Sequence, residues 1–352
     1  MDLETFWFVL IAVLWAGYFA LEGFDFGVGM LLPWVGRDDD DRSTMLRTIG
    51  PVWDANEVWL VVAGGATFAA FPAWYATMFS GFYVALLLVL FFLIIRVVSF
   101  EWRSKSESEG WRTFWTWCNT IGSAGAALVW GIGLSNLVYG VPIDSDGNYA
   151  GDFWDLFSPY TVFAGIALVL LFVFHGATFL TLRTVGELHD RAERTARRLA
   201  IPAALVAAVF LVWTVAVAVD RNDKDVFPPV LPAIIGIAAM LLAVFFLRGG
   251  RTGRAFSMTG VAAIAVVATL FTSLYPRVMV SDPDFGNSLT VDGASSSHYA
   301  LQVMSVVALI FVPLVLVYQG WTYYVFRRRV GGRGPEAAPS QQTAPTPAET
   351  KG

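Results

Sequence analysis

The sequence contains little that could build a covalent or metal-held framework. Among its 352 residues there is one cysteine, Cys118, and there are three histidines, His175, His189 and His298. A single cysteine excludes an internal disulfide and a cysteine-rich metal cage. No CxxC, HExxH or phosphate-binding glycine motif occurs in a useful context. The sequence therefore predicts no metal site in this chain.

Charge is also scarce. Charged residues make up 14% of the chain, whereas apolar residues make up 56% and aromatic residues 15%. Soluble domains usually carry about a quarter of charged residues. The net charge of −5 is small and acidic, which argues against a nucleic-acid surface. The composition therefore indicates a protein of the lipid bilayer.

Long apolar runs account for most of the chain. A membrane-spanning helix needs about 20 mostly apolar residues. The first run is not a cleaved signal peptide, because Asp2 and Glu4 stand where a positive region is required and the run is too long. The sequence predicts an all-α polytopic membrane protein with nine spans, at about 5–32, 50–71, 74–100, 112–140, 159–182, 199–219, 228–248, 255–276 and 299–326.

The connections between these spans predict the orientation. One alternating set of connections, with the C-terminal tail, holds 20 lysines and arginines, whereas the other set holds 3. Basic residues favour the cytoplasmic side, so the N-terminus is expected outside and the C-terminus in the cytoplasm. Residues 1–330 are expected to form one transmembrane domain. Residues 331–352 are rich in Pro, Ala, Thr and Gln and are expected to be a disordered cytoplasmic tail.

Two connections have distinctive compositions. Residues 183–199 carry many charges and are expected to form a cytoplasmic helix end. Residues 276–299 form the longest polar connection on the outer side. That connection could cover a partner, but its composition favours a plain solvated loop.

Four acids lie inside the predicted first and second spans. Glu22 and Asp25 are three residues apart, as are Asp54 and Glu57, so each pair is expected to share a helix face. The two spans run in opposite directions, which places the four carboxyls at similar depths. A carboxylate facing lipid costs about 2.5 to 3.5 kcal/mol. These acids must therefore face the interior, pair with cations or be protonated, which predicts a proton inlet from the cytoplasm.

Small and cyclic residues near these acids suggest how the helices pack. Gly23 and Gly27 have the spacing that lets another helix approach closely. Pro51 is expected in the first turn of the second span, where its missing N–H costs nothing. These positions predict close packing around the acidic stretch.

A simpler interpretation of the acids stays open. Asp54 and Glu57 could be ordinary acids at a helix N-terminus, favoured by the helix dipole, with Arg96 or other arginines neutralising them. Membrane haem usually needs axial His, Met or Cys donors, and only His175 lies deep in a span. A lone histidine on an apolar helix is more often a hydrogen-bonded packing residue than a ligand.

Four segments carry a family resemblance. Together they resemble subunit II of the cytochrome bd quinol oxidases, and the resemblance runs from the first span to about residue 326. The four segments are EGFDFGVGMLL (22–32), IGPVWDANEVWLVVAGGATFAAFPAWYATMFSGFYVALLLVL (49–90), RTVGELHDR (183–191) and NSLTVDGASS (287–296).

The resemblance implies a function, partners and a site. It implies two four-helix bundles and a ninth helix in a bacterial plasma-membrane oxidase that takes electrons from a quinol and reduces oxygen to water. It implies b- and d-type haems mainly on a larger partner, subunit I, with a quinone in a lipid-facing groove and small accessory subunits. Asp54 matches the acid of the family's WDAN motif and Asp25 the acid of its GFD motif, both on a proton path to which Glu57 and Glu22 are assigned.

Two other functions compete with this interpretation. A proton- or cation-coupled secondary transporter would use Asp25 and Asp54 as ion sites, and a purely structural subunit would use the acids for packing only. Transporters often contain broken helices and inverted repeats, and neither is clear in this sequence. Absence of b- and d-type haem bands and of a larger partner from the native complex would favour the transporter.

Overall fold

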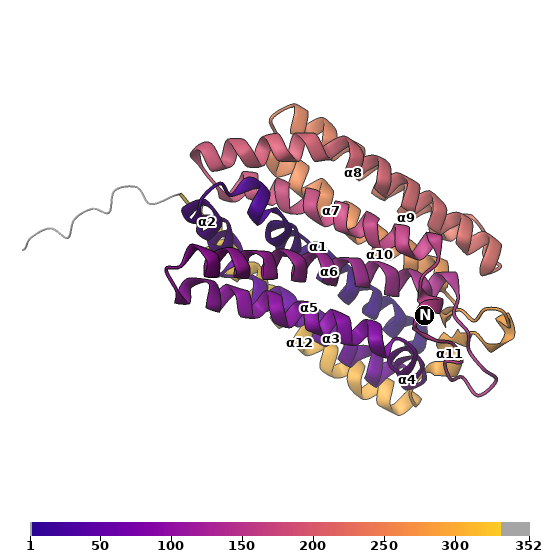
Figure 1. The fold of residues 1–352 in the computed structure, drawn as a ribbon. Coiled ribbons are helices and arrows are strands. Elements are labelled where there is room, and N and C mark those ends of the chain that lie inside the picture. Colours follow the sequence, from indigo (N-terminus) through magenta and orange to yellow (C-terminus); the bar gives the residue numbers. More distant parts are fainter. Residues whose placement is uncertain (1, 332–352) are drawn as a thin grey trace, which may run out of the picture.

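The structure, a computed structural model, describes residues 2–331. Almost all of the expected tail, from residue 332, lies outside the described residues. Helices account for most of the rest (Figure 1). They are α1 (Leu3–Val35), α2 (Asp39–Ile49), α3 (Trp53–Ala70), α4 (Pro72–Gly81), α5 (Tyr83–Trp102), α6 (Glu109–Tyr139), α7 (Pro159–Arg183), α8 (Gly186–Arg221), α9 (Phe227–Arg248), α10 (Thr252–Leu274), α11 (Val291–Ala294) and α12 (His298–Val325).

The predicted all-helical membrane architecture is confirmed. Within residues 2–331, eight helices are long and apolar enough to cross a bilayer, namely α1, α5 to α10 and α12. Helix α3 has only 18 residues and carries Asp54, Asn56 and Glu57 in its first turns, which lowers its apolar character. The count of nine spans and the orientation therefore stay predictions.

Two predicted helix boundaries are wrong. The third span, predicted over 74–100, is interrupted at Phe82, so that α4 is a separate short helix and α5 begins at Tyr83. The ring of Tyr149 occupies the space where a side chain of Gly81 would stand, with its nearest atom 2.4 Å from that Cβ position. Pro51 lies in a turn before α3, not in its first helical turn, because α3 begins only at Trp53.

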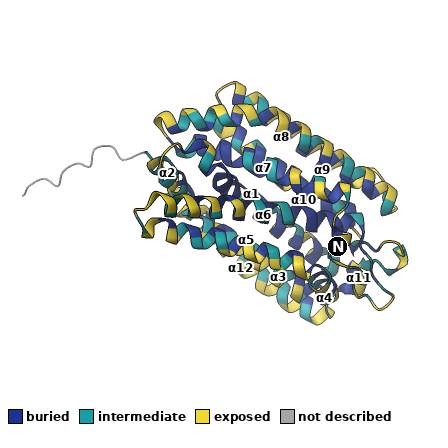
Figure 2. Ribbon diagram, in the orientation of Figure 1, coloured by how far each residue is buried: buried dark blue, intermediate teal, exposed yellow. Residues whose placement is uncertain are grey.

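The long helices form two groups with α12 beside them. Helices α7, α8, α9 and α10 pack on one another, and α5, α6, α1 and α3 form the second group. Helix α1 contacts members of both groups, which places it at the centre of the molecule. Helix α12 contacts α1 and α3 and lies at the edge opposite α8 and α9 (Figure 1). Figure 2 shows buried residues concentrated toward the middle and exposed ones on the outer faces.

The short helix α2 lies between the first two predicted spans. Its Asp39 forms ion pairs with Arg103, just after α5, and with Arg112, near the start of α6. The Asp39–Arg112 distance is 2.6 Å. Its Asp41 pairs with Arg191 of α8. Helix α2 therefore joins the ends of both helix groups through ion pairs. At the same end, α8 begins at Gly186, which agrees with a charged helix end over residues 183–199.

The longest polar connection, residues 276–299, is folded onto the end of the bundle. Strand β1 (Arg277–Met279) pairs antiparallel with β2 (Leu289–Thr290). The residues from Val278 to Val280 are buried, and the N–H of Ser296 donates to the carbonyl of Ala70 at 2.8 Å. The expectation of a plain solvated loop over 276–299 is therefore wrong. Apolar residues of this segment are buried against the helix ends.

The predicted close approach at Gly27 is confirmed. A Cβ atom at Gly27 would lie 1.9 Å from the carbonyl oxygen of Phe172 and 2.8 Å from the Cα of Gly176, both on α7. A Cβ at Gly23 would lie 2.6 Å from the ring of Phe172. Helices α1 and α7 therefore meet backbone to backbone beside the acidic residues of α1.

We expect Gly27→Ala to destabilise the protein by about 1 to 3 kcal/mol, because an added methyl forces α1 and α7 apart. The measurement is thermal unfolding of the purified protein. Gly133→Ala is the matched control, since a Cβ at Gly133 meets no atom within 4 Å. Equal unfolding temperatures for both variants and the wild type would contradict the prediction.

Candidate functional site

A buried ion pair joins α1 to α5. Glu22 and Arg96 both have 0% exposed side chains, and Glu22 Oε1 lies 2.6 Å from Arg96 Nη1. The guanidinium carbon of Arg96 lies 4.8 Å from the ring centre of Phe26 and 5.3 Å from that of Phe100. The aromatic faces and the carboxylate stabilise a cation that would otherwise be costly in this interior.

Asp25 lies in the same interior but has a different partner. It is fully buried, and its Oδ2 accepts a hydrogen bond of 2.7 Å from Nδ2 of Asn56 on α3. The Asn56 Oδ1 accepts from the hydroxyl of Tyr323 at 2.7 Å and from Nε2 of Gln319 at 3.2 Å. Both of these donors belong to α12. A hydrogen-bonded chain therefore runs from Asp25 through Asn56 to the otherwise exposed helix α12.

Glu57 and Asp54 occupy different environments. Glu57 Oε2 lies 4.0 Å from Arg96 Nη1, and the Glu57 side chain is 19% exposed. Asp54 is exposed and forms no ion pair with any residue of 2–331. The buried positions of α3 are Asn56, Ala63, Thr67 and Ala70. Asp54 lies off this stripe and is exposed, whereas Glu57 is partly buried near Arg96.

The structure therefore brings three of the four predicted acids together. Glu22, Asp25 and Glu57 gather near Arg96, whereas Asp54 stays outside. The alternative in which Arg96 neutralises Asp54 and Glu57 finds Arg96 4.0 Å from Glu57 and in no ion pair with Asp54, and the nearer partner of Arg96 is Glu22 at 2.6 Å. One guanidinium cannot neutralise three carboxylates, and an unpaired charge in a dry interior is very costly. The cluster can reach a low net charge only if some of its carboxyls hold protons.

Other polar groups line this interior. The hydroxyl of Tyr18, Nε1 of Trp130, Oδ1 of Asn119 and Oγ of Ser123 are buried and have no hydrogen-bond partner among residues 2–331. Tyr18 and Trp130 lie side by side, with ring centres 6.4 Å apart. Asn119 and Ser123 flank Gly29 of α1. These groups add unused hydrogen-bond donors and acceptors to the interior beside the acids.

Four residues of this site carry no direct signal in the sequence. Asn56, Trp59, Gln319 and Tyr323 connect α3 to α12, and Nε1 of Trp59 donates to Oε1 of Gln319 at 2.7 Å. Gln319 is a polar residue within an apolar span and could have been selected for that reason. Asn56 could not be preferred over its acidic neighbours without knowledge of which face of α3 is buried.

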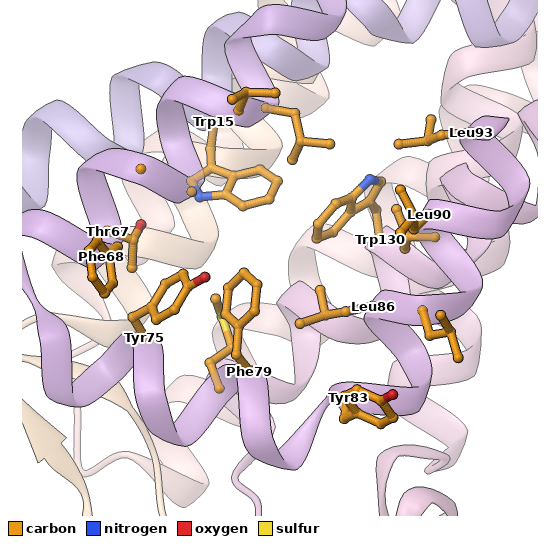
Figure 3. A pocket seen from close by; sticks show the side chains of 17 residues that line it. Trp15, Thr67, Phe68, Tyr75, Phe79, Tyr83, Leu86, Leu90, Leu93 and Trp130 are labelled. Carbon is orange, nitrogen blue, oxygen red and sulfur yellow. The ribbon is translucent and has the colours of Figure 1, made fainter. Parts of the chain in front are cut away.

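An apolar groove runs along the helices that carry the acidic cluster, and neither the three acids nor Arg96 lines it. It has a volume of about 550 Å³ and is lined by residues of α1, α3, α4, α5 and α6. Figure 3 shows the rings of Trp15, Trp130, Tyr75 and Phe79 around it. The two tryptophan rings are 4.9 Å apart, centre to centre. Its wall is almost entirely aliphatic and aromatic, so it suits an apolar ring or chain.

His175 does not fit the role of a haem ligand. Its Nδ1 lies 2.7 Å from the hydroxyl of Thr259 and its Nε2 lies 3.0 Å from the carbonyl oxygen of Ala20. Its ring stacks on Phe256 with centres 4.7 Å apart. Both ring nitrogens are thus engaged in packing, as predicted. Residues 2–331 also contain no group of three or more His, Cys, Asp and Glu side chains placed to hold a metal ion.

These features define a polytopic helical membrane protein with an ionisable interior. Comparison with known proteins gives its family. The family model for cytochrome bd terminal oxidase subunit II matches residues 3–326. The chain therefore belongs to the cytochrome bd terminal oxidase subunit II family.

Individual relatives agree with this assignment. Cytochrome bd ubiquinol oxidase subunit 2 of Bacillus subtilis is 41% identical over 339 residues, covering 95% of this chain and 98% of that protein. Cytochrome bd-I ubiquinol oxidase subunit 2 of Escherichia coli K12 is 37% identical over 360 residues, covering 93% and 95%. The bd oxidase structure from Geobacillus thermodenitrificans shares the fold, with a TM-score of 0.73, 19% identity and coverage of 93% and 99%.

Membership in this family identifies the complex to which the chain belongs. The chain is a subunit of a cytochrome bd oxidase, a quinol:oxygen oxidoreductase, and a multi-pass protein of the bacterial plasma membrane. The complex contains haem and a partner, subunit I. The alternative of a secondary transporter is not supported.

Proposed function

We propose that this chain is the haem-poor subunit that stabilises the haem-bearing subunit I and supplies protons from the cytoplasm to the site of oxygen reduction. The b- and d-type haems of the complex are assigned to subunit I. The engaged nitrogens of His175 support this assignment, because the deepest histidine of the chain has no free donor for iron.

The observation that carries the proton role is the complete burial of Asp25 beside Glu22, with one arginine for three acids. Asp54 on the surface of α3 receives protons at the contact with subunit I, and Glu57 is the next acid on the same helix. Asp25 and Glu22 form the buried reservoir, which binds and releases protons beside Arg96. A carboxyl placed within a membrane in this way is a functional site by default.

The electrical consequence follows from where the protons come from. Oxygen reduction consumes protons, and quinol oxidation releases them. If the consumed protons come from the cytoplasm and the released ones leave outside, charge is separated across the membrane. Each separated charge stores about 2.3 kcal/mol per 100 mV. This role requires the nine-span topology with the N-terminus outside, in which α3 is the ninth membrane helix.

The groove beside Trp15 and Trp130 is assigned to a bound quinone. Its volume of about 550 Å³ and its apolar, aromatic wall suit a quinone ring and part of an isoprenoid tail. The groove lies among α1, α3 and α5, the helices that carry the acidic cluster. A quinone held there would stabilise the helix group that carries the acids.

We expect Asp54→Asn to lower quinol-driven oxygen uptake by about tenfold, the lower end of the rate gain from a charged entrance. The measurement is oxygen uptake by the purified complex, with visible haem absorption to verify assembly. Unchanged turnover in a fully assembled complex would remove Asp54 from the proton path. A complex without haem bands or without subunit I would contradict the proposed function as a whole.

A further inference from the structure

A second cavity, of about 190 Å³, lies at the end of the bundle that carries α2. Its wall includes the apolar side chains of Val52, Phe179, Leu182 and Phe326. Two arginines also line it, Arg183 at the end of α7 and Arg327 just after α12. The cavity is therefore lined by apolar side chains together with two cations.

Neither arginine has an anionic partner among residues 2–331. Arg183 donates to the carbonyl of Phe326, and its Nε is buried without any hydrogen-bond partner in that range. Arg327 lies over the ring of Tyr324, 3.7 Å from its centre. By contrast, Arg96, Arg103, Arg112 and Arg191 each lie within 4.0 Å of a carboxylate. The cavity thus brings together two cations that no carboxylate of residues 2–331 compensates.

The cavity is close to the acidic cluster but is poorly suited to admit protons. Tyr323 lines it and donates to Asn56, the partner of Asp25. A pair of arginines lining a cavity repels hydronium ions, as arginines do in pores that exclude protons. The same pair favours an anion, and guanidinium groups bind phosphate through strong charge-assisted hydrogen bonds.

We propose that this cavity binds the phosphate of an anionic phospholipid from the adjoining leaflet. Arg183 and Arg327 hold the phosphate, and an acyl chain lies on Phe179, Leu182 and Phe326. The ends of membrane helices are where lipid headgroups lie, and basic pockets between such helices bind anionic headgroups. A soluble phosphate ion would use the arginines but not the apolar wall.

The test uses the purified complex with its partner subunit in nanodiscs of phosphatidylcholine, with or without phosphatidylglycerol. Native mass spectrometry measures the phosphatidylglycerol that stays bound. We expect Arg183→Gln to weaken retention about tenfold, the effect of losing one charged hydrogen bond. Arg327→Gln is expected to act in the same direction. Arg251→Gln, with the same loss of charge on an exposed residue outside the cavity, is expected to retain lipid like the wild type.

Three results would overturn the proposal. The first is equal retention by the wild type, Arg183→Gln and Arg327→Gln. The second is complete displacement of phosphatidylglycerol by inorganic phosphate, which would identify a site for a free anion. The third is increased retention after removal of residues 332–352, which would assign the cavity to the chain's own tail. The readout is bound lipid, so it is independent of oxygen uptake and of the proton path.

Discussion

Arg96→Met is expected to leave little assembled complex in the membrane. Arg96 is the only cation within 4.0 Å of Glu22 or Glu57 among residues 2–331, and its side chain is completely buried. Removing one partner of a buried ion pair costs about 3 to 5 kcal/mol, because the other charge stays in the interior without compensation. Net stabilities of folded proteins are about 5 to 15 kcal/mol, so this loss is a large fraction of the total. The measurements are the yield of purified complex and its unfolding temperature.

A double variant separates lost charge compensation from lost packing. Glu22→Gln combined with Arg96→Met removes both charges of the pair and is expected to recover part of the yield. Arg251→Met serves as the control for a change at an exposed arginine without an ion pair in the described part of the chain. A single Arg96→Met variant with normal yield and unfolding temperature would show that the buried cluster does not depend on this cation.

Asp25→Asn is expected to reduce quinol-driven oxygen uptake by about 100-fold, the lower end of the contribution of a positioned proton-transfer group. Asparagine has nearly the same shape, and its side-chain oxygen can still accept the 2.7 Å hydrogen bond from Asn56. It cannot bind and release a proton, so only the chemical step is removed. The same variant is expected to unfold at or above the wild-type temperature, because a neutral amide is easier to bury than a carboxyl that can ionise.

The measurement for Asp25→Asn compares turnover with visible haem absorption of the same preparation. Asp40→Asn is the control, since Asp40 is an exposed acid of α2 without an ion pair in the described residues. A normal rate in Asp25→Asn with intact haem bands would show that Asp25 serves only packing. A loss of haem bands together with activity would instead indicate a role in assembly.

The sequence alone determined that this protein lies in a lipid bilayer and where most of its helices run. Apolar runs of bilayer length predict helices wherever they occur, because hydrocarbon leaves no other partner for the backbone. The same logic selected Glu22 and Asp25, since an acid is costly wherever it lies in such a run. The four motifs then predicted the family, which the family model and the relatives confirm.

Only the tertiary structure decided which residues meet. The pairing of Glu22 with Arg96 joins two helices far apart in the sequence, and no local spacing encodes it. On α3, the hydrophobic pattern did not show that the face carrying Asn56 is buried while Asp54 is exposed. Beside the break at Phe82, the ring of Tyr149 from a distant loop packs against Gly81, a contact that no local pattern encodes. Bilayer insertion depends on the composition of each segment, whereas these contacts depend on how the helices are rotated against one another.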